Sequence, residues 1–167
     1  TMNFTPANSG IDEAPITLTA YGGNAINAII DGGDAETNNN VAIRMGDSTF
    51  LPYSTKNIII SNLTIRNFIQ IFNIRNTENI TFKNNIFYNV RTLPYAGGYS
   101  IGQQAFSGRN IIYDGNTFKD KIGYNTIDAV GGGTADNPTA YHIAYINNTF
   151  SNNPVHGALQ FEGNTTR

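Results

Sequence analysis

The chain contains 167 residues with a net charge of −2, and charged side chains make up only 13% of it, against about 25% in an average soluble domain. This balance leaves no basic face for nucleic acid, the absence of cysteine excludes disulfides and thiolate metal sites, and the apolar runs are too short for a membrane-spanning helix. The length is that of one domain with an independently folding core, so we predict a single domain over residues 1–167.

Five short segments mostly alternate apolar with polar residues, which is the pattern of a strand with one buried face. In chain order these predicted strands cover residues 41–45, 69–72, 100–103, 126–130 and 158–162. In the first of them Val41 and Ile43 are expected to point inward and Arg44 outward.

A twelve-residue pattern lies between successive strands and returns four times, at residues 57–68, 79–90, 110–121 and 142–153. The starts of these copies are 22, 31 and 32 residues apart. Periods of this size are typical of solenoids, in which each repeat buries its apolar face against its neighbours.

Two columns of the pattern predict the core. The second column is always isoleucine: Ile58, Ile80, Ile111 and Ile143. The ninth column is apolar and mostly aromatic: Ile65, Phe87, Phe118 and Phe150. We predict that each column stacks along the solenoid axis.

The seventh column predicts a corner. It consists of Leu63, Asn85, Asn116 and Asn148. Asparagine tolerates the left-handed backbone conformation and can bond neighbouring backbone at a bend, and stacked copies can also bond to one another. We therefore predict left-handed residues and an asparagine ladder at this corner.

Together these elements predict an all-β fold, a right-handed parallel β-helix (β-solenoid) of about five to six coils. One coil comprises a strand, a turn, the repeat strand, the asparagine corner and a short return strand. The longer spacings require loops, which we expect at residues 47–56, 91–98 and 131–141, where Gly, Pro, Asp and Ser are frequent.

This pattern resembles the parallel β-helix of the pectate-lyase-like superfamily, from about residue 15 to the end of the chain. The opening segments, residues 15–23 and 28–33, are similar to the first coils of secreted polysaccharide lyases. The resemblance implies a secreted or cell-surface, carbohydrate-active protein, with a polysaccharide lyase favoured over a glycoside hydrolase. The signature motifs of the best-known pectate lyases and polygalacturonases are absent, so no catalytic residue is carried over from either family.

The outward positions of the predicted strands carry the candidate site. Ile127 and Leu159 are equivalent, which places Asp128 beside Gln160 and Glu162 two residues further along. With strands about 4.8 Å apart and about 6.6 Å per two residues, the two carboxylates are expected about 8 Å apart. This distance lies within the separation of about 6.5–9.5 Å between the two catalytic carboxyl groups of inverting glycosidases. Acidic residues on a wet sheet face can also serve solubility alone.

Two loops rich in glycine, at residues 91–99 and 131–141, are expected to border this face. Their tyrosines can stack on the apolar faces of sugar rings. The predicted substrate-binding residues are therefore Arg44, Gln160, Tyr95, Tyr99 and Tyr141. The alternative interpretation is that each tyrosine packs its own loop onto the coil.

A polysaccharide lyase removes the proton beside a uronate carboxylate and needs a base and a cation that stabilises the developing charge. The predicted catalytic residues are Asp128, Glu162, Arg91 and His156. In this scheme the two acids bind substrate or a cation, and Arg91 or His156 assists. Ca²⁺ is a candidate cofactor, because Asp128, Glu162 and Asp136 can supply part of an oxygen ligand set.

A second class of function stays open. A non-catalytic β-helix that serves as an adhesin, surface or filament component is favoured by the low charge and the faces rich in Asn and Thr. A solenoid normally ends in a capping element, and none is recognisable after Phe161. We therefore expect further β-helix coils, a cap or a neighbouring chain at this end, and a chain that is a fragment of a longer one.

Overall fold

The computed structural model describes residues 1–33, 41–46, 53–68, 70–90, 105–106, 108–120, 127–131, 133–134, 137–138, 141–152 and 159–163. Within these ranges the protein is all-β, and its helices are the single-turn 3-10 helices η1 (Pro6–Asn8) and η2 (Tyr21–Gly23). No helix in this part of the chain is long and apolar enough to cross a membrane.

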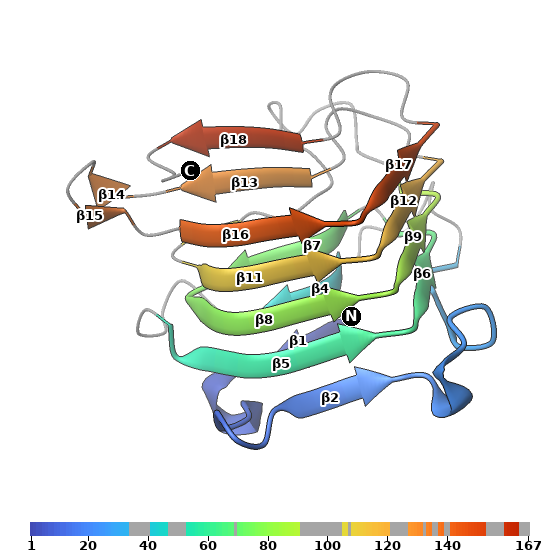
Figure 1. The fold of residues 1–167 in the computed structure, drawn as a ribbon, viewed down its shortest axis with the longest axis horizontal. Helices are drawn as coiled ribbons and strands as arrows, with labels where there is room; N and C mark the ends of the chain where they lie inside the picture. Colours follow the sequence, from blue (N-terminus) through green and yellow to red (C-terminus); the bar gives the residue numbers. More distant parts are fainter. Residues whose placement is uncertain are drawn as a thin grey trace.

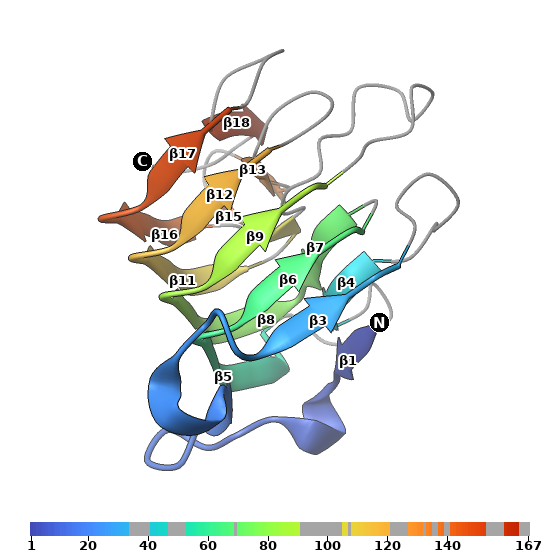
Figure 2. The same ribbon diagram turned by 90° about the vertical axis from the view of Figure 1, so that its right-hand side faces the viewer.

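Most of the strands belong to three sheets, in each of which strands from successive parts of the chain lie one above another (Figures 1 and 2). Every strand pairing within these sheets is parallel. The first sheet consists of β1 (Met2–Phe4), β4 (Val41–Met45), β7 (Gln70–Arg75) and β10 (Ala105–Phe106). The second consists of β2 (Ile16–Thr19), β5 (Thr55–Ser61), β8 (Thr77–Lys83), β11 (Arg109–Asp114) and β16 (Tyr141–Ile146). The third consists of β3 (Ile29–Asp31), β6 (Thr64–Arg66), β9 (Ile86–Tyr88), β12 (Thr117–Lys119) and β17 (Thr149–Ser151).

Two smaller pairs complete the described strands. β13 (Ile127–Gly131) pairs in parallel with β18 (Leu159–Gly163), and β13 lies against β10 of the first sheet. β14 (Gly133–Thr134) and β15 (Asn137–Pro138) form a short antiparallel pair inside the predicted loop at residues 131–141.

The chain visits the sheets in a fixed order. Each circuit adds one strand to the second sheet, then one to the third, then one to the first, as in β5, β6 and β7. Strands that are consecutive in one sheet therefore belong to successive circuits (Figure 1). This arrangement is compatible with the predicted parallel β-helix.

The repeat columns stack as predicted. Ile58 pairs with Ile80, Ile80 with Ile111, and Ile111 with Ile143, and the first three are fully buried. The ninth column pairs in the same way, and the rings of Phe87, Phe118 and Phe150 follow one another with centroids 5.0 Å apart. A second aromatic stack is formed by Phe82, Tyr113 and Tyr145, with centroids 4.9 and 5.0 Å apart. Strand pairing and ring stacking therefore hold the same residues together.

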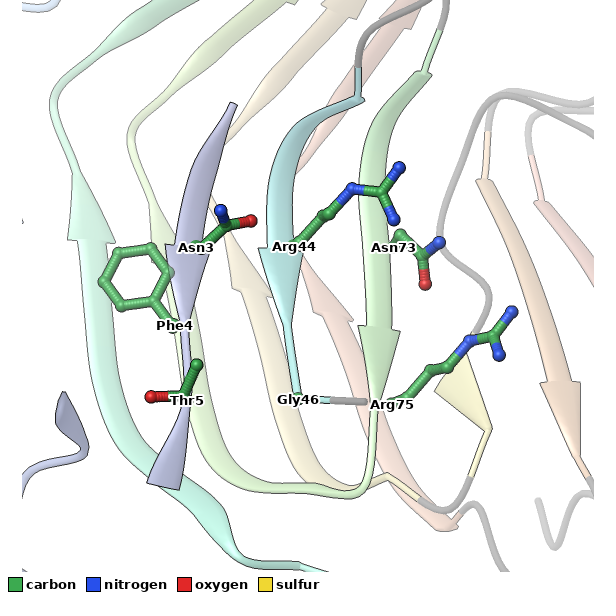
Figure 3. A pocket seen from close by; sticks show the side chains of 7 residues that line it. All are labelled: Asn3, Phe4, Thr5, Arg44, Gly46, Asn73 and Arg75. Carbon is green, nitrogen blue, oxygen red and sulfur yellow. The ribbon is translucent and has the colours of Figure 1, made fainter. Parts of the chain in front are cut away.

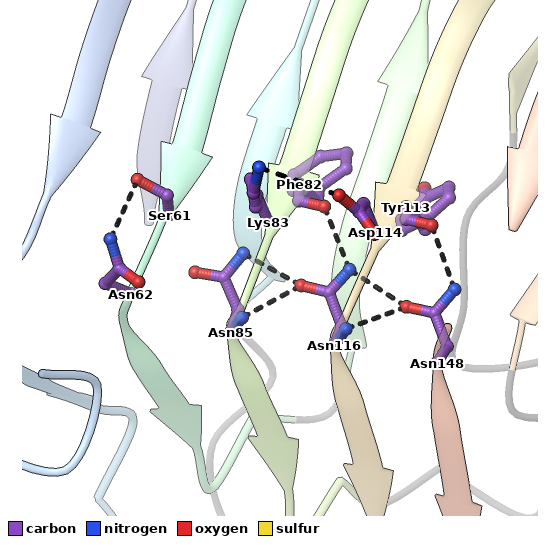
Figure 4. Close-up of polar contacts among 9 residues, drawn as sticks. All are labelled: Ser61, Asn62, Phe82, Lys83, Asn85, Tyr113, Asp114, Asn116 and Asn148. Carbon is purple, nitrogen blue, oxygen red and sulfur yellow. Dashed lines mark hydrogen bonds and ion pairs between the residues drawn. The ribbon is translucent and has the colours of Figure 1, made fainter. Parts of the chain in front are cut away.

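Buried asparagines line the corner between the second and third sheets (Figure 4). The Nδ2 group of Asn85 donates to Oδ1 of Asn116 at 3.0 Å, and Asn116 donates to Asn148 at 3.1 Å. Each Oδ1 also accepts the backbone N–H of the preceding column member, as Asn85 does from Leu63. The side chains thus satisfy backbone groups that would otherwise be buried without partners.

The predicted left-handed conformation of this column is wrong. The left-handed residues instead occupy the first, sixth and eleventh columns of the repeat: Asn57, Asn79, Asn110 and His142; Asn62, Asn84, Gly115 and Asn147; and Asn67, Asn89, Asp120 and Asn152. The bend is made one residue before the buried asparagine, whose own side chain is then free to point inward.

The strands of the first sheet differ slightly from the sequence prediction. The segment at residues 41–45 is confirmed as β4, whereas the strand predicted at 69–72 extends to Arg75 in β7. The segment at 100–103 lies outside the described residues. The strands predicted at 126–130 and 158–162 begin and end one residue later, in β13 and β18.

Candidate functional site

The outer face of the first sheet is polar where its inner face is apolar. On the inner face Met2, Ile43 and Phe72 stand in one row across β1, β4 and β7. One residue further along, the outer row consists of Asn3, Arg44 and Asn73. Ile43 is fully buried and Arg44 is exposed, so the predicted outward direction of Arg44 is confirmed.

A surface groove of about 330 Å³ crosses this face. Figure 3 shows the side chains that line it: Asn3, Phe4, Thr5, Arg44, Gly46, Asn73 and Arg75. All come from β1, β4, β7 or the residue that follows each of the first two strands. The strands of the first sheet therefore hold the lining side chains of the groove in place.

Gly46 allows the end of β4 to lie close to the backbone of β7 beside the groove. It follows β4 with a left-handed φ of 68°, and a Cβ atom there would stand 1.8 Å from the carbonyl oxygen of Arg75. Only glycine fits this backbone and this close approach.

Two guanidinium groups dominate the electrostatics of the groove. Arg44 pairs with Asn73, and Arg75 lies two residues further along β7, so their Cα atoms are about 8 Å apart by strand geometry. Arg44 makes no hydrogen bond or ion pair with the described residues, and none of the described residues that line the groove carries a carboxylate. The groove is therefore suited to an anion.

Guanidinium groups bind carboxylate and sulfate through two parallel N–H bonds. The amides of Asn3 and Asn73 and the hydroxyl of Thr5 add donors and acceptors for hydroxyl groups. Among the lining residues that the structure describes none is an ordinary proton-transfer group, because arginine keeps its proton in proteins. These residues can contact and orient an anionic ligand, and proton transfer requires a further residue.

The other predicted residues fall into two groups. Asp128 pairs with Gln160, and Val130 pairs with Glu162, so the predicted register of these strands is confirmed. Tyr141 is the first residue of β16 in the second sheet, where it pairs with Arg109 rather than with a strand of the groove. The remaining predicted site residues lie outside the described part of the chain: Arg91, Tyr95, Tyr99, Asp136 and His156.

Sequence reasoning missed Asn3, Asn73 and Arg75. The predicted strand ended at Phe72, whereas β7 continues through Ile74, which is buried, to Arg75. The alternation of Phe72 and Ile74 with Asn73 and Arg75 was the signal that could have extended the strand. β1 offered no such signal, since only three residues pair with β4.

A second charged row lies on the third sheet and is built differently. Asp31, Arg66, Tyr88 and Lys119 follow one another across β3, β6, β9 and β12. Nε of Arg66 stands 2.7 Å from Oδ2 of Asp31, and Lys119 lies 5.0 Å from the centre of the Tyr88 ring. In this row the cations are engaged within the protein, which contrasts with Arg44.

Hydrogen bonds lower the pKa of Asp31. The backbone N–H of Gly33 has the largest effect, followed by the amide of Asn67, with a smaller effect from Arg66. These donors stabilise the ionised carboxylate, whose hydrogen bonds hold neighbouring surface residues together. We therefore assign this row to stability rather than to the site.

Metal ligands do not gather in the described residues, where no group of three His, Cys, Asp or Glu side chains could hold an ion. Comparisons with protein-family models, curated proteins and solved structures find no match to this chain. The chemistry of the groove is therefore the basis for a functional inference.

Proposed function

We propose that the chain binds an acidic polysaccharide on the outer face of the first sheet and acts on it as a polysaccharide lyase. The observation that carries this proposal is the groove whose described lining residues include two guanidinium groups and no carboxylate. We further infer a right-handed β-helix of the pectate-lyase-like kind. The parallel sheets support the β-helix, and the near-universal hand of β-crossover-β connections supports its handedness.

In the proposed complex a uronate carboxylate pairs with Arg44 or Arg75. The sugar hydroxyls bond with the amides of Asn3 and Asn73. The groove is lined by residues of three neighbouring strands, β1, β4 and β7 (Figure 3), and this extent suits a segment of a long chain. A secreted or cell-surface location follows from such a substrate and belongs to the same proposal.

The proposed reaction is a β-elimination. A base takes the proton from the carbon beside the carboxylate, and a guanidinium group stabilises the enediolate that forms. The electron pair then forms a C=C bond as the bond to the glycosidic oxygen breaks, and that oxygen leaves as a hydroxyl group once it has taken up a proton. Because the described lining residues include no base, we assign this role to His156, while Arg91 assists by stabilising the developing charge and Asp128 and Glu162 bind substrate or Ca²⁺.

Binding is tested by calorimetry with a uronate polymer and a neutral glucan. Loss of one charge-assisted contact is worth about 1.5–3 kcal/mol, so Arg44→Gln should weaken uronate binding about tenfold or more. The matched control is Lys119→Gln, which removes the same charge from the third sheet and should bind as the wild type does. Equal weakening by both variants would show that only net charge matters.

Catalysis is tested separately by the ultraviolet absorbance of the unsaturated product. Asp128→Asn should reduce turnover at least about a hundredfold, the scale of a lost electrostatic contact in the transition state, because it removes a ligand of the substrate or of the cation, with an unchanged melting temperature. Equal turnover would remove Asp128 from the mechanism. Binding without any product would leave a saccharide-binding protein, and the absence of both would favour the adhesin or filament alternative.

A further inference from the structure

The outer face of the second sheet, which Figure 1 shows from the front, carries exposed apolar side chains. Among the described residues that follow β3, two large apolar side chains are exposed, Ile112 at 36% and Ile146 at 45%. Ile112 lies between Ile111 and Tyr113, which are fully buried, so it points out of the sheet. Ile146 pairs with Asp114, two residues further along the same face. Exposed apolar side chains that gather on one face mark a candidate interaction surface.

Ile112 belongs to a row that crosses the sheet from strand to strand. Ile59, Thr81 and Ala144 occupy the same position in β5, β8 and β16, and all three are half-buried. These four side chains offer methyl groups and no charge. They form an apolar strip along the centre of the face.

Charged side chains flank the apolar strip on both sides, with opposite signs within each strand. β8 carries Glu78 before the strip and Lys83 after it. β11 carries Arg109 before the strip and Asp114 after it. Within the chain Arg109 pairs with Glu78 at 2.6 Å and Lys83 with Asp114 at 3.7 Å. An apolar centre with a polar rim is the usual organisation of a protein–protein interface.

This order of charges makes each strand complementary to a reversed copy of itself. When β8 faces an antiparallel β8 of a second chain, Glu78 of each chain lies opposite Lys83 of the other. In β11 the same reversal places Arg109 opposite Asp114. Lys56 of β5 then lies opposite the uncharged Ser61. Like charges therefore do not meet among these residues, and opposite charges meet in both middle strands.

We propose that two copies of this chain form a symmetric dimer through the outer faces of their second sheets. The two-fold axis runs from strand to strand along the apolar strip, so that the Ile112 side chains of the two copies meet. Facing sheets lie about 10 Å apart, which leaves room for the side chains of both strips. At each rim Glu78 and Arg109 of one copy then form a network of alternating charge with Lys83 and Asp114 of the other.

The arrangement is the same for any number of coils, because each strand meets its own copy. It is also independent of the proposed saccharide binding. The groove belongs to the first sheet, whose strands β4 and β7 lie behind the second sheet in Figure 1, and the dimer leaves both grooves accessible.

Sedimentation velocity over a concentration series tests the proposal. As concentration rises, the wild type should shift from the 18.2 kDa of one chain to twice that mass and no further. Ile112→Lys places two like charges against each other on the axis and should weaken dimerisation at least about a hundredfold. Thr149→Lys adds the same charge at an exposed position of the third sheet and should dimerise as the wild type does. A monomeric wild type, or equal weakening by both variants, would overturn the proposal.

A charge swap tests the orientation of the two copies. Lys83→Glu and Glu78→Lys each place like charges opposite one another, so each variant alone should dimerise about tenfold or more weakly. In a mixture of the two variants the changed positions face each other with opposite signs, and dimers should form again. Lys119→Glu makes the same charge change on the third sheet and should leave dimerisation unchanged.

Circular dichroism checks that each variant folds. If Glu78→Lys does not fold, Arg109→Glu and Asp114→Lys repeat the swap on β11, where the same reversal opposes them. A mixture of folded variants that stays monomeric would overturn the proposed two-fold arrangement.

Discussion

The second and third sheets are built on repetition, whereas the first sheet is not. In the second and third sheets each circuit adds a strand in the same register, as the column Ile58, Ile80 and Ile111 of the second sheet illustrates. In the first sheet the strands have different lengths, from the two residues of β10 to the six of β7, and the outer row changes from Asn3 to Arg44 to Asn73. The residues that repeat from coil to coil form the core, and the residues that do not repeat line the groove.

The physical reason is that a single coil cannot bury its own apolar face. Every coil depends on the layers above and below it, so a core column tolerates only side chains that stack. An outward position on the first sheet has no such constraint. It can therefore hold a guanidinium group without cost to its neighbours.

The largest effect should follow from breaking a repeated column. Phe118 is buried between Phe87 and Phe150, so Phe118→Ala should lower the free energy of unfolding by about 3–5 kcal/mol. Phe150→Ala, in the partly exposed last layer, should cost less. Denaturant unfolding measures both, and equal or near-zero losses would contradict the role of the column.

A comparable loss should follow from breaking the buried corner. Asn116→Leu copies the residue that Leu63 supplies in the first copy, but it leaves the backbone N–H of Asn85 and the carbonyl of Phe82 without their partner. Each buried group left unpaired costs about 1–3 kcal/mol. The control is Asn84→Gly, which alters an exposed left-handed residue and should change stability by no more than about 0.5 kcal/mol. Equal stability of both variants would contradict the role of the buried amide.

Repetition also explains what the sequence could and could not predict. The core columns and their pairing were predictable because four copies align. The left-handed residues were misplaced by one position because asparagine occupies both the sixth and seventh columns, as in Asn84 and Asn85. The groove could be predicted only at Arg44. Asn3 and Arg75 reach it through a short first strand and an unrepeated strand end, which leave no periodic signal.

A weaker effect, which depends on pH, is expected for the stability contributed by Asp31 on the third sheet. The pKa of Asp31 is lowered by its hydrogen bonds from Gly33 and Asn67, so the carboxylate stabilises the folded state above the ordinary carboxyl pKa of about 3.9. This contribution is lost as the pH falls through the lowered pKa. Wild type should therefore melt slightly above Asp31→Asn at neutral pH, and the difference should vanish in strong acid. A difference that persists or grows in acid would have the wrong sign.

The smallest effect on stability should come from the groove itself. Arg44 is exposed and makes no hydrogen bond or ion pair with the residues that the structure describes, so Arg44→Gln should change the free energy of unfolding by no more than about 0.5 kcal/mol. The same substitution should weaken uronate binding about tenfold or more. A side chain that is dispensable for folding and required for binding is what distinguishes the unrepeated sheet from the columns. If Arg44→Gln instead destabilised the fold as strongly as Asn116→Leu, the groove residues would be needed for folding. The distinction between a first sheet that binds ligand and core columns that stabilise the fold would then be wrong.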